Sequence, residues 1–225
     1  MPRAFPFFTV VTLLLACPTL ARAQTESPEA HRKRGTHHAP HEKAGPDPWE
    51  FSISACYAFV PDNRNYIQPT VTADRDWLHL EGRYNYEALD TGSAWFGYNL
   101  RVGKKLSLDF TPMLGGVFGH TAGVAVGYEG TLSWWKLELY GEGEYLSDTS
   151  DSSDSYFYTW TQLSLAPVDW FSFGVVGQRT QVVETKRNIQ RGFLFGLSYK
   201  QADLSIVVLN PDDSPSVLID LSFAF

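Results

Sequence analysis

Hydrophobic and polar residues alternate one by one along most of the chain after Trp49. In residues 77–87, "WLHLEGRYNYE", leucine, glycine and tyrosine share one face, and the charged and amide side chains share the other. Residues 94–102 and 106–115 repeat the scheme. A period of two is typical of β-strands with one apolar face. We predict about twelve strands, with ten also compatible with the pattern, at residues 49–60, 66–74, 77–87, 94–102, 106–115, 121–131, 135–146, 156–165, 170–180, 190–199, 203–209 and 216–225.

The lengths of these strands and their connections indicate how they are arranged. Most have about 9–12 residues, the length that a tilted strand needs to cross the hydrocarbon layer of a membrane. The sequence after the first residues contains no run of about 18 apolar residues, which excludes a transmembrane helix there. Tight turns such as residues 102–105, "VGKK", alternate with longer polar connections such as residues 147–155, "SDTSDSSDS". Short turns on one rim and longer loops on the other are typical of outer-membrane barrels.

Aromatic residues gather at both ends of the apolar face. Tryptophans 49, 77, 135 and 170 each open a strand at the short turns. The opposite rim is expected to carry Tyr57, Phe59, Tyr84, Tyr86, Phe96, Tyr145 and Phe157. Such girdles mark the two interfaces of a membrane barrel, whereas a soluble sandwich or barrel has no reason to sort aromatic residues by height. We therefore predict that the apolar face contacts lipid, with Leu78, Leu80, Phe96, Leu108, Phe193 and Phe195 on it.

The chain ends in the strand "VLIDLSFAF", residues 217–225, with an apolar residue at every second position and a terminal phenylalanine. This tail resembles the C-terminal assembly signal of Gram-negative outer-membrane β-barrel proteins of the porin-like class. The resemblance covers residues 49–225 as an architecture and is specific only at the tail. It implies a single antiparallel, up-and-down transmembrane β-barrel in the cell outer membrane. It also implies two partners, the membrane lipids and the barrel-assembly machinery, which would read Leu221, Phe223 and Phe225.

The N-terminal residues differ in character from the strands. Arg3, the apolar run 5–16 and the Ala-Arg-Ala site at 21–23 predict a cleaved signal peptide over residues 1–23, with a lipoprotein box at Leu14–Cys17 as the alternative. Residues 24–48 are polar and proline-containing, and we predict a disordered periplasmic spacer there. The alternative is a transition-metal site, because imidazoles at short spacing can share an ion. Its ligands would be His31, His37, His38 and His41.

If the apolar face contacts lipid, the polar face lines a lumen. Most of its charge falls between residues 79 and 144, and the opposite wall is small and neutral. Counting along the strands places Arg101 between Glu81 and Asp109, and Lys136 is expected to add a further cation. Carboxylates nevertheless outnumber cations on this face. The candidate selectivity residues are Glu81, Arg83, Arg101, Asp109, Glu129, Glu138 and Glu142.

Composition restricts the function. A net charge of −7 argues against nucleic acid as a partner. After signal cleavage Cys56 would be the only cysteine, which excludes an internal disulfide and a cysteine metal cluster. The acidic loop 147–155 lacks the spacing of a calcium-binding hand, so a solvated loop is expected. The sequence gives no motif for a cofactor or metal, and none is predicted.

Three functions remain open. The charged wall favours a narrow channel for small solutes, either cations or neutral molecules. The same charges could instead neutralise one another inside a structural barrel that its own side chains plug. A barrel hydrolase, either a protease or a lipid-modifying enzyme, is the third reading, with His120 near Glu144 or Asp148. The strands show no Ser/His/Asn pattern, so we assign no catalytic residue and do not expect an enzyme.

Overall fold

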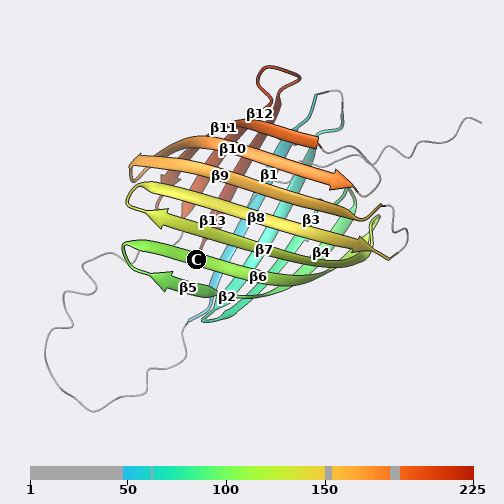
Figure 1. Ribbon diagram of the computed structural model, residues 1–225, viewed down its shortest axis with the longest axis horizontal. Helices are drawn as coiled ribbons and strands as arrows, with labels where there is room; N and C mark the ends of the chain where they lie inside the picture. Colours follow the sequence, from blue (N-terminus) through green and yellow to red (C-terminus); the bar gives the residue numbers. More distant parts are fainter. Residues whose placement is uncertain (1–47, 62, 150–153, 183–187) are drawn as a thin grey trace, which may run out of the picture.

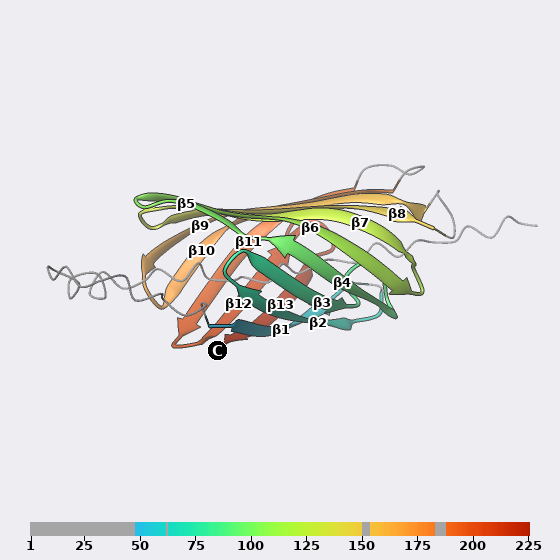
Figure 2. The same ribbon diagram turned by 90° about the horizontal axis from the view of Figure 1, so that it is seen from below.

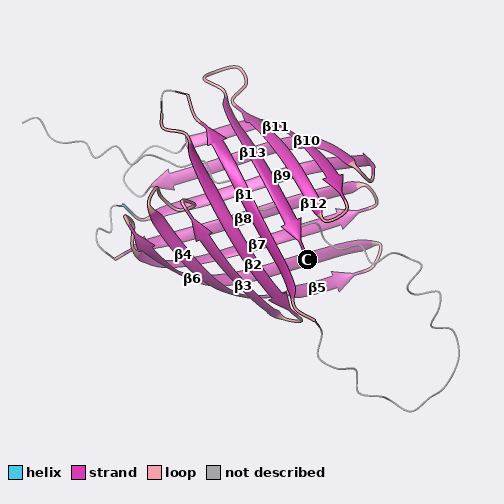
Figure 3. Ribbon diagram, turned by 180° about the vertical axis from the view of Figure 1, so that it is seen from behind, coloured by secondary structure: helices cyan, strands magenta, loops and turns pink. Residues whose placement is uncertain are grey.

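The computed structural model describes residues 48–61, 63–149, 154–182 and 188–225. The predicted signal peptide, and the predicted spacer up to residue 47, lie outside the described residues. The described chain forms one antiparallel β-sheet that closes on itself (Figures 1 and 3). Its strands are β1 (Glu50–Phe59), β2 (Tyr66–Arg75), β3 (Leu78–Tyr84), β4 (Thr91–Tyr98), β5 (Leu100–Gly103), β6 (Leu106–Gly119), β7 (Gly123–Trp134), β8 (Leu137–Asp148), β9 (Tyr156–Val168), β10 (Phe171–Val182), β11 (Asn188–Tyr199), β12 (Ala202–Leu209) and β13 (Ser216–Ala224).

Each strand pairs with its neighbour in the chain, and β13 pairs with β1 to close the barrel. β4 and β5 both pair with β6, so they are one strand interrupted at Asn99. The result is a barrel of twelve strands, which confirms the predicted fold. In Figure 2, β1–β3 form one wall and β7–β9 the wall that faces it. Among the described residues, no helix is long and apolar enough to cross a membrane.

The connections at the two ends of the barrel differ, as predicted. At one end, five turns of two residues each join β2–β3, β5–β6, β7–β8, β9–β10 and β11–β12. Asp76, Trp135 and Lys200 have φ values of 54°, 56° and 55° in these turns, the left-handed conformation that two-residue hairpin turns favour. The first strand begins and the last strand ends at this end of the barrel, where Phe51 and Phe225 exchange backbone hydrogen bonds of 2.9 Å. We call this end the short-turn rim and the opposite end the long-loop rim.

The outside of the barrel is apolar. Phe193 and Phe195, predicted to face lipid, are 50% and 51% exposed, and Leu80 and Leu108 are also exposed. Large apolar side chains alternate outward on strand after strand and share no common core on that face. A continuous apolar exterior of this kind is stable against lipid and not against water, so the barrel is of the membrane-spanning type. Other exposed members of this surface are Ile53, Val71, Phe96, Leu114, Val126, Val175 and Leu197.

Five of the seven tryptophans are exposed near the short-turn rim, including the four that the sequence assigned to it. Two assignments to the other girdle were wrong. Tyr86 is only 6% exposed and lies inside the barrel, because Asn85 adopts a φ of 58° that ends the strand and turns the chain inward. The Phe96 ring centroid lies 6.3 Å from that of Trp77, so Phe96 belongs to the short-turn half of the exterior.

The barrel interior contains a cluster of buried apolar and aromatic side chains, which we call the interior cluster. Ala58, Tyr66 and Leu209 lie at strand ends near the long-loop rim, so the cluster fills that half of the barrel. A smaller group around Trp95 and Met113 lies beside it on the β4–β8 wall. The interior cluster comprises Cys56, Ala58, Tyr66, Tyr86, Tyr140, Tyr158, Trp160, Val176, Leu194, Val207, Leu209 and Leu218.

Candidate functional site

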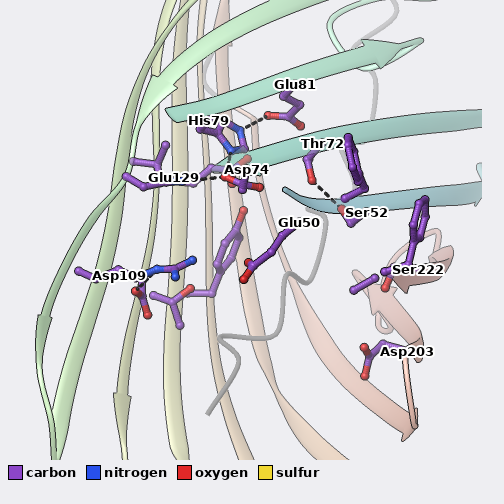
Figure 4. Close-up of a pocket in the computed structure, with 18 of the residues that line it drawn as sticks. Glu50, Ser52, Thr72, Asp74, His79, Glu81, Asp109, Glu129, Asp203 and Ser222 are labelled. Carbon is purple, nitrogen blue, oxygen red and sulfur yellow. Dashed lines mark hydrogen bonds and ion pairs between the residues drawn. The ribbon is translucent and has the colours of Figure 1, made fainter. Parts of the chain in front are cut away.

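The half of the barrel nearer the short-turn rim contains a cavity of about 420 Å³ (Figure 4). Rim residues such as Trp49, Lys200 and Phe225 line its mouth, and Tyr140 lines it deeper in the barrel. We call it the short-turn cavity. Six carboxylate residues line it, against two cations, Arg101 and Lys200, and His79. The six are Glu50, Asp74, Glu81, Asp109, Glu129 and Asp203.

A chain of hydrogen bonds runs along one wall of this cavity. Asn99 Nδ2 donates to Asp74 Oδ1 at 2.7 Å, and Thr111 Oγ1 donates to Asn99 Oδ1 at 2.7 Å. The ring of His79 lies between two carboxylates, with Nδ1 2.8 Å from Asp74 Oδ1 and Nε2 3.4 Å from Glu81 Oε2 (Figure 4). The imidazole ring therefore joins Asp74 of β2 to Glu81 of β3 on the cavity wall.

Below the cavity floor, Arg83 connects opposite walls of the barrel. Its Nε and Nη2 atoms donate to the two oxygens of Glu81 at 2.8 and 2.9 Å, a bidentate pair within β3. Nη2 also donates to Glu129 Oε1 of β7 at 3.1 Å, and Nη1 lies 3.6 Å from Glu144 Oε2 of β8. The side chain of Arg83 is 4% exposed. Because β3 and β7–β8 lie on facing walls (Figure 2), these ion pairs cross the lumen.

Aromatic rings enclose this charge cluster. The Arg83 guanidinium carbon lies 4.4 Å from the ring centroid of Tyr86 and 4.8 Å from that of Trp95, which are cation–π contacts. Tyr86 donates its hydroxyl proton to Glu142 Oε1, and Tyr140 donates to Glu142 Oε2 at 2.7 Å. We call Glu81, Arg83, Glu129, Glu142 and Glu144 the Arg83 cluster. The space left beside it is about 10 Å³, about the room that one water molecule needs.

The interior around the Arg83 cluster is packed but not purely apolar. Trp160, Gln162 and Gln178 are 0%, 2% and 3% exposed, and Asp220 is 2% exposed. Each has a side-chain polar atom that makes no hydrogen bond with the described residues. Buried polar atoms are usually satisfied by protein or water. These groups therefore favour an interior that water enters over a dry core.

The structure places the predicted lumen residues in two groups. Glu81, Arg83, Glu129 and Glu142 meet in the Arg83 cluster. Arg101, with its side chain 67% exposed, pairs with Asp109 at 3.2 Å near the mouth. Glu81 instead pairs with Arg83, so the predicted bridge from Arg101 to Glu81 was wrong, because Arg101 and Asp109 are direct register partners on β5 and β6.

Two other predicted lumen charges lie away from the cavity. Glu138 is half-buried and does not line the short-turn cavity. Lys136 lies in the β7–β8 turn, where its Nζ contacts the carbonyl oxygen of Pro167, so it is a rim residue and not a cation of the lumen.

Sequence reasoning missed the aromatic residues that hold the charges. Trp95 and Tyr140 lie on the inward phase of their strands, next to outward Phe96 and Leu139, so their place on the polar face was the available signal. Tyr86 gave no such signal, because it continues the outward phase of residues 78–84 in the sequence.

The weaker candidates do not form a site among the described residues. His120 is exposed in the β6–β7 connection, where its backbone N–H donates to Asp90 O at 3.1 Å, while Glu144 and Asp148 are buried. Within the described ranges, no group of three or more histidine, cysteine or acidic residues could hold a metal ion. Asp151 of the acidic loop and the four spacer histidines lie outside the described residues.

The C-terminal strand closes the barrel. β13 pairs with β1 over Ser52–Phe59, and Leu221, Phe223 and Phe225 are 43%, 45% and 69% exposed on the outside. They are therefore accessible from the lipid side, as an assembly signal requires. Their role in assembly stays a prediction.

Known proteins resemble this chain in fold and not in sequence. No family model matches it, and no curated protein matches it in sequence. The solved structure of the KdgM porin is similar with a TM-score of 0.56 and 8% identity, over 77% of this chain and 99% of that one. The structure of KdgM porin in complex with disordered oligogalacturonate has a TM-score of 0.57 and 8% identity, over 77% of this chain and 99% of that one. The NanC porin has a TM-score of 0.50 and 13% identity, over 77% of this chain and 98% of that one. At these identities the likeness concerns the fold.

Proposed function

We propose that this chain is a porin-like protein of the Gram-negative outer membrane that forms a narrow channel for small cations or neutral solutes. The path runs from the short-turn cavity past the Arg83 cluster toward the long-loop rim. The observation that carries the proposal is the run of carboxylates along this path. They extend from Glu50 and Asp74 near the mouth, through Glu81 and Glu129, to Glu142 and Glu144.

The charge of the wall supports a preference for cations. In the short-turn cavity six carboxylates face two cationic side chains and His79, and the Arg83 cluster adds two further carboxylates, Glu142 and Glu144, and one guanidinium. A narrow lumen with low-dielectric walls concentrates such a field, which attracts cations and repels anions. One of the similar structures is a porin in complex with oligogalacturonate, an acidic sugar. The carboxylate wall of this chain disfavours a ligand of that charge.

The packing at the Arg83 cluster supports a low conductance. The pocket beside the cluster has a volume of only about 10 Å³, which is too small for a hydrated ion. We therefore expect small and infrequent current steps, in contrast to the steady current of an open porin.

Conductance of the refolded protein in a planar lipid bilayer tests this proposal. In a salt gradient, the reversal potential should show a cation preference. Changing Glu129 and Glu142 together to glutamine should lower the ratio of cation to anion permeability about twofold or more, because both line the path. Asp212→Asn is the matched control, since Asp212 lies on the exposed β12–β13 loop with its side chain 68% exposed. An anion preference, or equal permeability ratios for all variants, contradicts the proposal.

A plugged structural barrel is the second candidate. The interior cluster favours it, because twelve large or apolar side chains fill the half of the lumen near the long loops. On this reading the carboxylates and Arg83 only neutralise one another and fasten the walls. Absence of current from the wild-type protein and from variants that loosen the Arg83 cluster would support the plug over the channel.

A further inference from the structure

We propose that the β3–β4 connection, Asn85–Asp90, is an internal gate of this channel, with Tyr86 as its latch on Glu142. The inference rests on the proposed function, because a gate needs a path to close. The connection lies at the long-loop rim between the ends of β3 and β4. It folds into the barrel instead of standing above it, since Tyr86 and Glu87 are 6% and 8% exposed while the preceding Tyr84 is 45% exposed.

Two residues in the left-handed conformation turn this segment inward. Asn85 and Asp90 have φ values of 58° and 56°, a conformation that Asn and Asp tolerate better than most residues. The Asn85 N–H donates to Thr91 O at 2.8 Å, and Asn85 Oδ1 accepts from the Asp90 N–H at 2.8 Å. Asn85 Nδ2 donates to Ile67 O at 3.0 Å, and Gln68 Nε2 donates to Asn85 O at 2.9 Å. Three of these hydrogen bonds fix the base of the segment to β2 and β4, and the fourth, between Asn85 and Asp90, holds its two ends together.

The tip of the segment reaches the opposite wall of the barrel. Tyr86 starts beside β3 and donates its hydroxyl proton to Glu142 of β8. Its ring contacts that of Tyr158 of β9 edge-on, with centroids 6.2 Å apart. Because β8 and β9 face β3 across the lumen (Figure 2), this one side chain connects two walls of the barrel next to the short-turn cavity.

The rest of the tip fills the space toward the rim. Glu87 Oε1 accepts from Ser93 Oγ at 2.6 Å and lies 3.4 Å from Trp95 Nε1. Ala88 and Leu89 pack against the interior cluster. The segment thus completes the plug that separates the Arg83 cluster from the long-loop rim.

The tip is held by side-chain contacts, whereas every hydrogen bond of the base involves a backbone atom, so the tip can move while the base stays in place. Tyr86 is linked to the far wall by its hydrogen bond to Glu142 and its ring contact with Tyr158, and both are side-chain contacts that can break without disturbing a strand. Glu87 Oε2 is buried without a hydrogen bond to the described residues, like the other polar atoms that favour a hydrated interior. Outward movement would hydrate that carboxylate and free Glu142 to face a passing cation. The proposal therefore assigns two positions to this segment, the inward one of the structure and an outward one, as a gate requires.

Single-channel recording of Tyr86→Phe tests the gate. This change removes the hydroxyl that bonds Glu142 and keeps the ring that stacks on Arg83, so we expect the open probability to rise about tenfold. Tyr86→Ala, which also removes the ring contacts, should raise it further. Tyr140→Phe is the matched control: it also removes a hydroxyl that bonds Glu142, but Tyr140 belongs to β8 itself and does not move with the segment. Heat-modifiable mobility on gels verifies that each barrel is folded.

The outcomes separate the gate from the channel. If the wild type conducts and neither Tyr86→Phe nor Tyr86→Ala changes its open probability, the gate is refuted but the channel is not. An equal rise in Tyr86→Phe and Tyr140→Phe also overturns the gate, because the effect then follows the charge of Glu142 and not the segment. Absence of current from the wild type and from both Tyr86 variants refutes the channel and the gate together. A rise in the Tyr86 variants alone supports both.

Discussion

Replacing Arg83 with methionine should destabilise the barrel more than any other single change to its charged interior. The substitution keeps much of the side-chain length and removes the guanidinium that joins β3 to β7 and β8. Glu81, Glu129 and Glu144 would then face one another with their shared cation gone. The aromatic faces of Tyr86 and Trp95 would lose their cation as well.

The structure sets the size of the effect. Arg83 makes three hydrogen bonds of 2.8–3.1 Å to carboxylates, and its side chain is 4% exposed, so solvent screens these contacts little. Removing one partner of a buried ion pair costs about 3–5 kcal/mol. We expect a loss of this size in the free energy of unfolding. Arg83→Met/Glu81→Gln should recover part of it, because one of the stranded charges is gone.

Urea unfolding of barrels refolded in lipid vesicles, followed by tryptophan fluorescence, measures this loss. Arg191→Met is the matched control, because Arg191 lies 3.4 Å from Asp212 with its side chain 81% exposed, and such surface pairs contribute about 0–1 kcal/mol. A loss below about 1 kcal/mol for Arg83→Met, or one equal to that of the control, would refute the view that this residue fastens the two walls.

Two further predictions concern the membrane and assembly. Leu114→Arg, near the middle of β6, should cost about 2–4 kcal/mol in the same unfolding assay, and Leu106→Arg at the short-turn rim about 0–1, since the cost of a charge on the lipid face falls with distance from the midplane. Leu108, which the sequence analysis placed on the lipid face, lies two residues from the start of β6, so arginine should cost less there than at Leu114. Deleting Phe225 should lower the yield of inserted barrel in cells and leave export intact; unchanged insertion, seen on heat-modifiability gels, would argue that the tail is an ordinary closing strand.

The strands were predictable because their signal is local. A period of two in hydrophobicity fixes both the strand and the face that contacts lipid, and the two-residue turns fix the connections. The hydrophobic period could not show a turn of the backbone that leaves the alternation of residues in the sequence unchanged. Residues 85–87 continue the pattern of β3 in sequence, yet the left-handed Asn85 turns them into the barrel. That conformation is stabilised by Ile67 and Gln68 on another strand, so no local pattern announces it.

The candidate site was predictable only in its composition. The polar phase of each strand correctly identified the inward charges Glu81, Arg83, Glu129 and Glu142. Which of them meet depends on the register between strands and the shape of the barrel. Counting residues along the strands placed Arg101 beside Glu81, a position that Arg83 occupies in the structure. The apolar filling was missed because Leu194 and Val207 lie in strands with apolar residues on both faces. In such strands alternation does not show which side chains point inward.

The position of the Arg83 cluster links stability to permeability. A barrel of twelve strands is wider than the small barrels that side chains fill easily, and in this chain side-chain contacts nevertheless cross the lumen. Here those contacts are ion pairs, and the same guanidinium that fastens the walls also opposes the passage of cations. Arg83→Met should therefore weaken the barrel and favour cation entry at once. Glu142 is different, because it accepts hydrogen bonds from tyrosines, one of them on the movable segment. Changes at Glu142 and Tyr86 should therefore alter permeability with less loss of stability than changes at Arg83. For this reason the Tyr86–Glu142 contact suits opening better than the ion pairs of Arg83 do.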